Sequence, residues 1–430
     1  MENTGTTIFS DNYIVDSTAF VDRNYVNINA HELAHQWFGN LVTEKDGNSH
    51  WLHEGFATYY SYLAEKNIFG EEYYYWKLYD SAEALHKQQS NQKGEALTNP
   101  KASSLTFYEK GAWALHMLRE EIGDKAFKKG IASYLNKYQF KNVEIADFIS
   151  TMEKASGKNL ASFQEKWLNG KVFPYKEVKM HLAKKSKSIQ TLQFVEEEVL
   201  VASSSFLSKE KIINGYWDKT ESTDLKSRMI ATFSEFLSED FKIDALHTNN
   251  LKIRQAVAKS TIKVPENLKE AYESLLLDKS YSTQENALYA LWSSFSKERG
   301  KYLDQTQGLV GLPNKNIRLL WLTLAMVTPE YNSLKTADYY TELVRYTNPS
   351  YSTEVRIGAF QFLKETIGLD NTSLKNLMRA TSHHSWQFKK YARNLLSELI
   401  KDEDLKNRAV SLSKEFNENE MPYFNSLLKI

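Results

Sequence analysis

The sequence predicts a mainly α-helical protein of two domains, with a few short strands near its start. Three observations support this fold class. The chain has 430 residues, more than one hydrophobic core usually accommodates. Its apolar residues recur mostly at helical spacing. Gly170 and Pro174 interrupt the helical pattern, so we expect one domain over residues 1–174 and a second over residues 175–430.

The first elements of the chain are expected to be short. Residues 6–9 and 13–15 are β-branched or aromatic for the most part, which predicts short strands. Residues 26–38 form a helical pattern without breakers, and Gly39 is suited to end that helix. After a loop with capping residues, residues 51–65 again carry apolar side chains at helical spacing.

The rest of the chain is predicted to be helical. Further helices fit residues 72–90, 107–122, 124–137 and 144–155, and residues 190–204 fit a helix or a strand equally well. Beyond about residue 225, similar segments recur roughly every 35 residues, three of them opening with Arg254, Arg318 and Arg356. An ordinary helical bundle and a HEAT/armadillo-like solenoid of stacked helix pairs explain this recurrence about equally. We expect an all-α, HEAT/armadillo-like second domain. Neither fold would supply chemistry of its own.

Composition excludes several classes of protein. The 54 basic and 54 acidic residues give zero net charge, so the basic surplus of nucleic-acid or membrane-surface binders is absent. No apolar stretch approaches the ~20 residues that cross a bilayer. Because the chain has no cysteine, any metal must be bound through nitrogen and oxygen.

The first predicted helix carries the motif His31-Glu32-Leu33-Ala34-His35. Side chains four residues apart lie on one face of a helix, so both imidazoles can bind one ion with the glutamate beside them. The spacing therefore predicts a metal site on this helix.

A catalytic zinc needs a third protein ligand and leaves its fourth position to water. Glu54 is the best candidate, because the intervening loop is long enough to bring the second helix back along the first. His50 and His53 are the alternatives, although a loop or surface role is more common for such histidines. We expect one Zn²⁺ per chain, held by His31, His35 and Glu54.

Such a site predicts the hydrolysis of an amide bond. A divalent metal lowers the pKa of bound water, and Glu32 is placed to take the proton as that water attacks a carbonyl. A purely structural zinc site is the alternative, but it would leave Glu32 without a role.

The sequence resembles the zinc aminopeptidases of the alanyl aminopeptidase and leukotriene hydrolase family, a branch of the thermolysin-like gluzincins. Their signature is HExxH, eighteen residues, and then a glutamate within Trp-Leu-x-Glu-Gly-Phe-Ala, which residues 31–35 and 51–57 match. The resemblance is strong over about residues 1–175. It implies a thermolysin-like zinc-binding subdomain that acts on peptides with a free N-terminus.

Two further motifs of the family imply residue roles. Members carry Gly-x-Met-Glu-Asn upstream of the zinc motif, and the start of this chain looks like the end of that motif. This implies that Glu2, with Asn3 beside it, binds the α-amino group of the substrate. Tyr108 lies in the family's Tyr-x-Lys-Gly context, which implies that its hydroxyl donates to the oxyanion.

The sequence departs from the family at three places. Asp46-Gly47 stands where many members have Trp-Trp, and Ser61 stands where a glutamate commonly supports the zinc ligands. The β-rich N-terminal domain and catalytic sheet of the family would lie upstream, so we expect a longer protein and an exposed edge near residues 6–15. A targeting signal would lie there too, and the compartment, cytoplasmic or secreted, is not predicted.

Two other functions fit parts of the sequence. An endopeptidase could use the same metal site, but the amine anchor at Glu2 would block internal cleavage. A helical-repeat binding module with an inactive peptidase core is a second alternative, which the intact set of His31, His35, Glu54 and Glu32 argues against.

Overall fold

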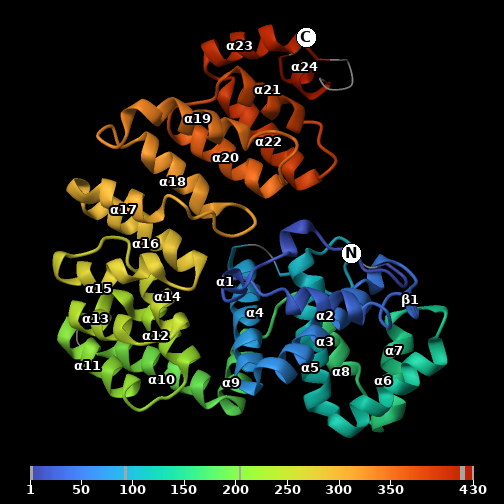
Figure 1. The fold of residues 1–430 in the computed structure, drawn as a ribbon. Helices are drawn as coiled ribbons and strands as arrows, with labels where there is room; N and C mark the ends of the chain where they lie inside the picture. Colours follow the sequence, from blue (N-terminus) through green and yellow to red (C-terminus); the bar gives the residue numbers. More distant parts are fainter. Residues whose placement is uncertain (1–2, 92–93, 203–204, 417–421, 429–430) are drawn as a thin grey trace. The chain divides into compact units, whose positions relative to one another are not determined.

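The protein is described by a computed structural model that covers residues 3–91, 94–202, 205–416 and 422–428 (Figure 1). Packing divides the chain into two compact units. The first comprises the residues up to Ser10 and Asn24–Met229, and the second comprises Asp11–Arg23 and the residues from Ile230 onward. The domain boundary after residue 174 stays a prediction, because packing groups neighbouring helices without marking where a sequence domain ends.

The first unit is built from helices joined by short connections. Its helices are α2 (Val26–Ala34), α3 (Trp51–Phe69), α4 (Glu71–Asn91), α5 (Gly111–Ile122), α6 (Asp124–Tyr138), α7 (Ile145–Ser156), α8 (Ala161–Phe163), α9 (Tyr175–Lys185), α10 (Lys187–Val201), α11 (Phe206–Trp217) and α12 (Thr223–Phe233), the last of which runs into the second unit. Three short helical turns, η2 (Gly47–Ser49), η3 (Thr106–Lys110) and η4 (Gln164–Asn169), lie between them. Residues 190–201, which fit helix or strand equally in the sequence, are helical.

The second unit is entirely helical in its described residues. Its helices are α1 (Ser17–Phe20), α13 (Glu239–His247), α14 (Leu251–Ser260), α15 (Lys269–Glu273), α16 (Tyr281–Ser294), α17 (Arg299–Thr306), α18 (Asn316–Met326), α19 (Thr336–Arg345), α20 (Thr353–Glu365), α21 (Asn371–Ala380), α22 (Trp386–Leu399), α23 (Glu403–Ser413) and α24 (Pro422–Leu428). No helix among the described residues has the length and apolar character that crossing a membrane requires.

The helices of the second unit stack in succession. Helix α14 packs on α16, α16 on α18, α18 on α20 and α20 on α22, while α19 packs on α21 and α21 on α23. Figure 1 shows this series in yellow to red. Among the larger contacts, each helix packs mainly on its neighbours in the series, which is typical of a solenoid of stacked repeats. The HEAT/armadillo-like prediction is therefore confirmed.

The recurring arginines connect neighbouring helices of this stack. Arg254 Nε donates to Asp278 at 2.6 Å, and Arg318 Nε donates to Glu342 at 2.9 Å. Arg356 is buried and donates through Nε to the carbonyl of Thr347 at 3.0 Å. The sequence repeat thus has a structural cause.

The prediction of two strands near the start of the chain is wrong. Residues 6–10 and 14–16 have no regular secondary structure, and Asp11–Tyr13 forms the short 3₁₀ turn η1. A strand needs a neighbour for its backbone N–H and C=O groups. In the described residues the one sheet lies elsewhere, where β1 (Val42–Glu44) pairs in parallel with β2 (Lys141–Val143). These two strands are too short to produce an alternating pattern in the sequence.

Helix α3 is the central element of the first unit and packs against α2, α4 and α5. At the crossing with α5, two glycines face each other. A Cβ atom on Gly55 would lie 2.9 Å from Gly111 Cα, and one on Gly111 would lie 2.8 Å from Gly55 Cα. The two backbones are therefore in contact, which brings Glu54 close to the turn η3 that precedes α5.

Candidate metal centre

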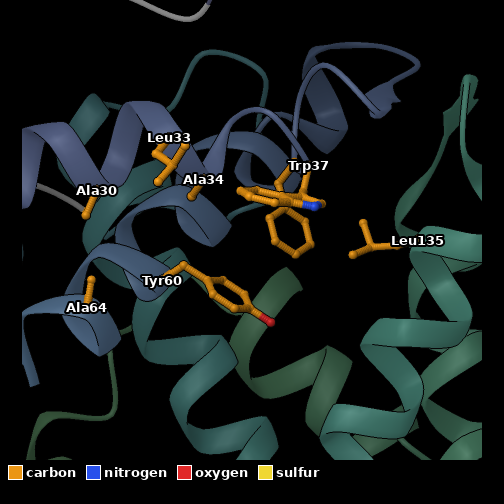
Figure 2. A pocket seen from close by; sticks show the side chains of 8 residues that line it. Ala30, Leu33, Ala34, Trp37, Tyr60, Ala64 and Leu135 are labelled. Atoms are coloured by element: carbon orange, nitrogen blue, oxygen red, sulfur yellow. The ribbon is translucent and has the colours of Figure 1, made fainter. Parts of the chain in front are cut away.

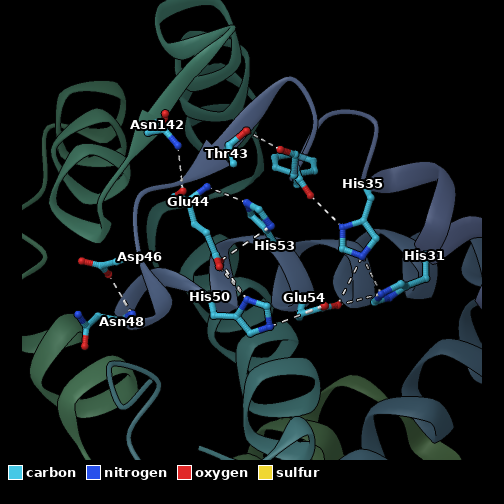
Figure 3. Close-up of polar contacts among 12 residues, drawn as sticks. His31, His35, Thr43, Glu44, Asp46, Asn48, His50, His53, Glu54 and Asn142 are labelled. Carbon is cyan, nitrogen blue, oxygen red and sulfur yellow. Dashed lines mark hydrogen bonds and ion pairs between the residues drawn. The ribbon is translucent and has the colours of Figure 1, made fainter. Parts of the chain in front are cut away.

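Three side chains meet at one point of the first unit (Figure 3). His31 Nε2 lies 3.1 Å from His35 Nε2 and 3.2 Å from Glu54 Oε2, and His35 Nε2 lies 3.4 Å from the same oxygen. A tetrahedral zinc ion with bonds of about 2.0–2.1 Å separates its ligand atoms by roughly 3.3 Å. The three atoms are therefore spaced as ligands of one zinc ion, and the imidazole and carboxylate donors suit that metal.

The two histidines remain on one helical face although α2 is shorter than predicted. The helix ends at Ala34 and not near residue 38, because the chain turns toward β1 after that residue. The N–H of His35 nevertheless donates to the carbonyl of His31 at 3.2 Å, which completes the last turn. Glu54 comes from the first turn of α3, the helix that packs on α2.

Hydrogen bonds on the far side of both imidazoles direct their Nε2 atoms to the centre. His35 Nδ1 lies 3.0 Å from the Phe38 carbonyl oxygen, which can only accept, so Nδ1 carries the proton. The Thr58 hydroxyl donates to the Glu54 carbonyl at 2.7 Å, and its oxygen lies 3.4 Å from His31 Nδ1, from which it can accept. Each Nε2 thus has a lone pair for a metal.

Thr58 was not identified from the sequence. Ser61, where the family commonly has a supporting glutamate, donates to the Thr58 carbonyl at 2.7 Å and accepts from Asn27 at 2.9 Å. The hydroxyl of Thr58, one turn after Glu54, is the group beside His31 instead. Its position four residues after the third ligand was the signal that could have found it.

The carboxylate of Glu54 is ionised in this environment. Burial raises the pKa of Glu54, but its contacts with the His31 and His35 rings outweigh that effect and hold the pKa well below its ordinary value. The ionised form is the one that binds a metal.

The two alternative ligands face a different carboxylate. His50 Nδ1 donates to Glu44 Oε1 at 3.0 Å, and the Glu44 backbone N–H donates to His53 Nε2 at 2.7 Å (Figure 3). Burial lowers the pKa of His53, so this ring is neutral near pH 7. His50 Nε2 lies 3.8 Å from the second oxygen of Glu54. Both histidines therefore surround the third ligand without joining His31 and His35.

The two residues expected to act on the substrate lie near the centre. Glu32 is half-buried and adjacent to His31 on α2. Tyr108 lies on η3, a short π-helix, and its ring stacks on that of His31 with 5.3 Å between centroids and 5° between planes. Such π-turns are frequent at functional sites.

Lys110 fixes the turn that carries Tyr108. Its buried ammonium donates to the carbonyls of Glu95 and Gly170 at 2.7 and 2.6 Å. Burial lowers the pKa of Lys110 to about 8, against the opposing charge of Glu95. In the sequence, Lys110 served only as the context of a motif.

The expected amine-binding residues lie at the start of the chain. Glu2 is outside the described residues. Asn3 is half-buried, and its carbonyl accepts from Gln36 Nε2 at 3.1 Å, while Gln36 Oε1 accepts from the N–H of Gly5 at 3.3 Å. The side chain of Gln36 thus holds this segment beside the end of α2, which carries the two expected zinc ligands.

A separate pocket of about 340 Å³ adjoins α2 (Figure 2). It is lined by Ala30, Leu33, Ala34, Trp37, Phe38, Tyr60, Ala64 and Leu135. None of the three expected zinc ligands lines it, and its walls are almost entirely apolar. It is therefore no binding site for a charged amine.

Two imidazoles and one carboxylate are the protein ligand set of mononuclear centres in hydrolytic zinc enzymes. Residues 1–167 match the Peptidase family M1 domain. This match confirms that the first part of the chain resembles the alanyl aminopeptidase and leukotriene hydrolase family.

Curated relatives match a comparable share of the chain. Aminopeptidase M1-D from Oryza sativa is 33% identical over 192 residues, which cover 42% of this chain and 22% of the relative. Aminopeptidase N from Lactococcus lactis is 34% identical over 195 residues, 40% of this chain and 22% of the relative. The chain thus spans about a fifth of the length of these relatives.

Solved structures of the family also resemble parts of the chain. An M1 zinc metallopeptidase from Deinococcus radiodurans covers 34% of this chain and 33% of its own, at 28% identity and a TM-score of 0.31. Leukotriene A4 hydrolase from Saccharomyces cerevisiae covers 79% of this chain and 53% of its own, at 18% identity and a TM-score of 0.41.

Proposed function

We propose that the chain carries the catalytic centre of a zinc-dependent aminopeptidase, which removes N-terminal residues from peptides. The observation that carries the proposal is the triangle of ligand atoms from His31, His35 and Glu54, with sides of 3.1, 3.2 and 3.4 Å. The M1 domain over residues 1–167 supports it. The aminopeptidase names of the curated relatives agree with this substrate class.

The three ligands would hold one Zn²⁺, which when bound lowers the pKa of water and polarises the substrate carbonyl. Glu32 takes the proton of the attacking water and delivers it to the leaving nitrogen. Tyr108 donates to the oxygen on which negative charge develops. Glu2, assisted by Asn3, binds the α-amino group and so restricts cleavage to the first peptide bond.

In this proposal the chemistry belongs to residues 1–174, and residues 175–430 form a helical domain that follows it. The amine anchor separates an aminopeptidase from an endopeptidase. Hydrolysis of an N-acetylated peptide as fast as its free counterpart would therefore favour an endopeptidase.

The central test is the variant Glu32→Gln. It keeps the shape of the side chain but removes the base, so we expect zinc content to be unchanged and turnover to fall roughly 10²–10⁴-fold. Glu121→Gln, an exposed position on α5, serves as the matched control and should keep full turnover. Unchanged turnover in Glu32→Gln would refute the assignment, and sub-stoichiometric zinc in the unaltered protein would favour an inactive core.

A further inference from the structure

A second group of metal-binding side chains lies in the first unit, away from the centre described above. His116 and Glu120 are four residues apart on α5, and His181 lies on α9. One ligand atom from each residue lies within 4.8 Å of the others. The construction is that of the first centre: a pair one helical turn apart, completed by a donor from another helix.

The two imidazoles meet through the nitrogens that bind metals. His116 Nε2 and His181 Nε2 are 2.8 Å apart, a distance at which one neutral ring donates its N–H to the lone pair of the other. A zinc ion can take the place of this hydrogen bond, with both ring protons on Nδ1, once the nitrogens separate to roughly 3.3 Å, which a shift of about half an ångström achieves.

The surroundings prepare the rings for a cation. The hydroxyl oxygen of Tyr74 lies 2.8 Å from His116 Nδ1 and can accept a hydrogen bond from its N–H. In that tautomer the lone pair of His116 is on Nε2. Burial lowers the pKa of both His116 and His181, so both rings are neutral near pH 7. Neutral imidazole is the form that binds zinc.

The cluster is accessible from solvent. A pocket of about 440 Å³ is lined by His116, Glu120 and Tyr74, together with further residues of α3, α4 and α5. Glu120 is exposed, whereas His116 is buried. The pocket gives an ion access to Glu120 and His116, and His181, which is half-buried, meets His116 outside the pocket lining.

Cationic side chains oppose a metal at this position: Lys66 and Arg119 line the same pocket, and Lys185 contacts one of the ligands. The ammonium of Lys185 lies 2.6 Å from Glu120 Oε2, where it neutralises the carboxylate. A zinc ion must displace this ammonium, so the ion pair lowers the affinity of the cluster. Lys185 is about one-third exposed, and its long side chain can move into solvent at little cost.

We propose that His116, Glu120 and His181 form a second, low-affinity zinc site, with the fourth position open to water from the pocket. Two neutral imidazoles and one carboxylate are a ligand set that zinc accepts. Occupancy fastens α9 to α5, the helix that begins directly after the turn carrying Tyr108. The site is independent of the proposed peptidase activity.

The test is a titration of the full chain with Zn²⁺ in the double variant His31→Ala/His35→Ala, which lacks the first centre. Calorimetry should find one remaining equivalent with a Kd below about 100 µM, and the melting temperature should rise with zinc. Lys185→Gln in this background should tighten binding about tenfold, because the competing cation is gone. His181→Gln should abolish the equivalent, although its amide can still bond to His116.

His384→Gln is the matched control, because this exposed histidine lies outside both clusters and should leave the equivalent unchanged. No bound zinc in the double variant would overturn the proposal. So would binding that survives His181→Gln, or an affinity that Lys185→Gln leaves unaltered. The Lys185 variant changes a partly exposed residue, so its result does not depend on a core substitution being tolerated.

Discussion

The support that Thr58 gives to His31, a proposed zinc ligand, can be tested by removing a single oxygen. Thr58→Val replaces the hydroxyl with a methyl group of similar size, so no cavity forms. The hydroxyl bridges the Glu54 carbonyl at 2.7 Å and His31 Nδ1 at 3.4 Å. Without it, the His31 ring loses its acceptor and can rotate or change tautomer. The ring then presents its Nε2 lone pair to the metal in a smaller fraction of molecules.

The size of the effect follows from the geometry. Removing a group that orients a metal ligand typically weakens metal binding 10–100-fold. The contact to His31 is longer than the usual 2.7–3.2 Å of an N–H···O bond, so we expect the lower end of that range. The prediction is a Kd for zinc raised about tenfold, equivalent to about 1.4 kcal/mol.

Competition against a chromophoric zinc chelator at fixed pH measures this Kd directly. Thr58→Ser keeps the hydroxyl and should bind zinc within about twofold of the unaltered protein, so it is the matched control. If Thr58→Val and Thr58→Ser bind zinc equally well, the hydroxyl does not orient His31 and the reasoning is refuted. Equal melting temperatures of the two zinc-free variants would show that the substitution changes zinc affinity and not the stability of the fold.

Three further variants test the rest of the site. Tyr108→Phe should lower kcat roughly 10²–10³-fold on an aminoacyl anilide with little change in KM; a change in KM alone would contradict the oxyanion role. Gly55→Ala places a Cβ 2.9 Å from Gly111 Cα, so denaturant titration should show a loss of about 1–3 kcal/mol. Its control, Gly215→Ala, meets nothing within 4 Å and should gain up to about 1 kcal/mol; equal stabilities of the two variants would argue against the close crossing. Lys110→Met should remove a pH dependence of the unfolding free energy. Between pH 8 and 10.5, Lys110 keeps its proton in the unfolded chain but has lost it in the folded protein, so the unfolding free energy of the unaltered protein rises with pH. The difference between the unaltered protein and Lys110→Met should therefore grow by about 3 kcal/mol over that interval, and a constant difference would disprove the lowered pKa.

The features that the sequence predicted well depend on local geometry. His31 and His35 share a face because a helix repeats every 3.6 residues, a property independent of the remaining fold. Placing Glu54 required only that the next helix pack on the first. The solenoid followed from a repeat that is visible in the sequence, and packing between successive helices decided between the two folds it allowed.

The features that were missed depend on residues far apart in the chain. Strands β1 and β2 pair Val42 with Lys141, and their three-residue length gives no periodic signal. The strands expected at residues 6–15 rested on local residue preference alone, and the described structure has no strand there. His116 and His181 are 65 positions apart, so no motif spacing could join them.

The contact between Gly55 and Gly111 also bears on how this site could be redesigned. Main-chain atoms have no alternative rotamers, so exchanging side chains at the crossing cannot change how closely α3 and α5 approach each other. Libraries aimed at new specificity should leave both glycines untouched. Diversity belongs instead on the surrounding loops, where a change in shape does not shift the position of Glu54 relative to the tyrosine-bearing turn.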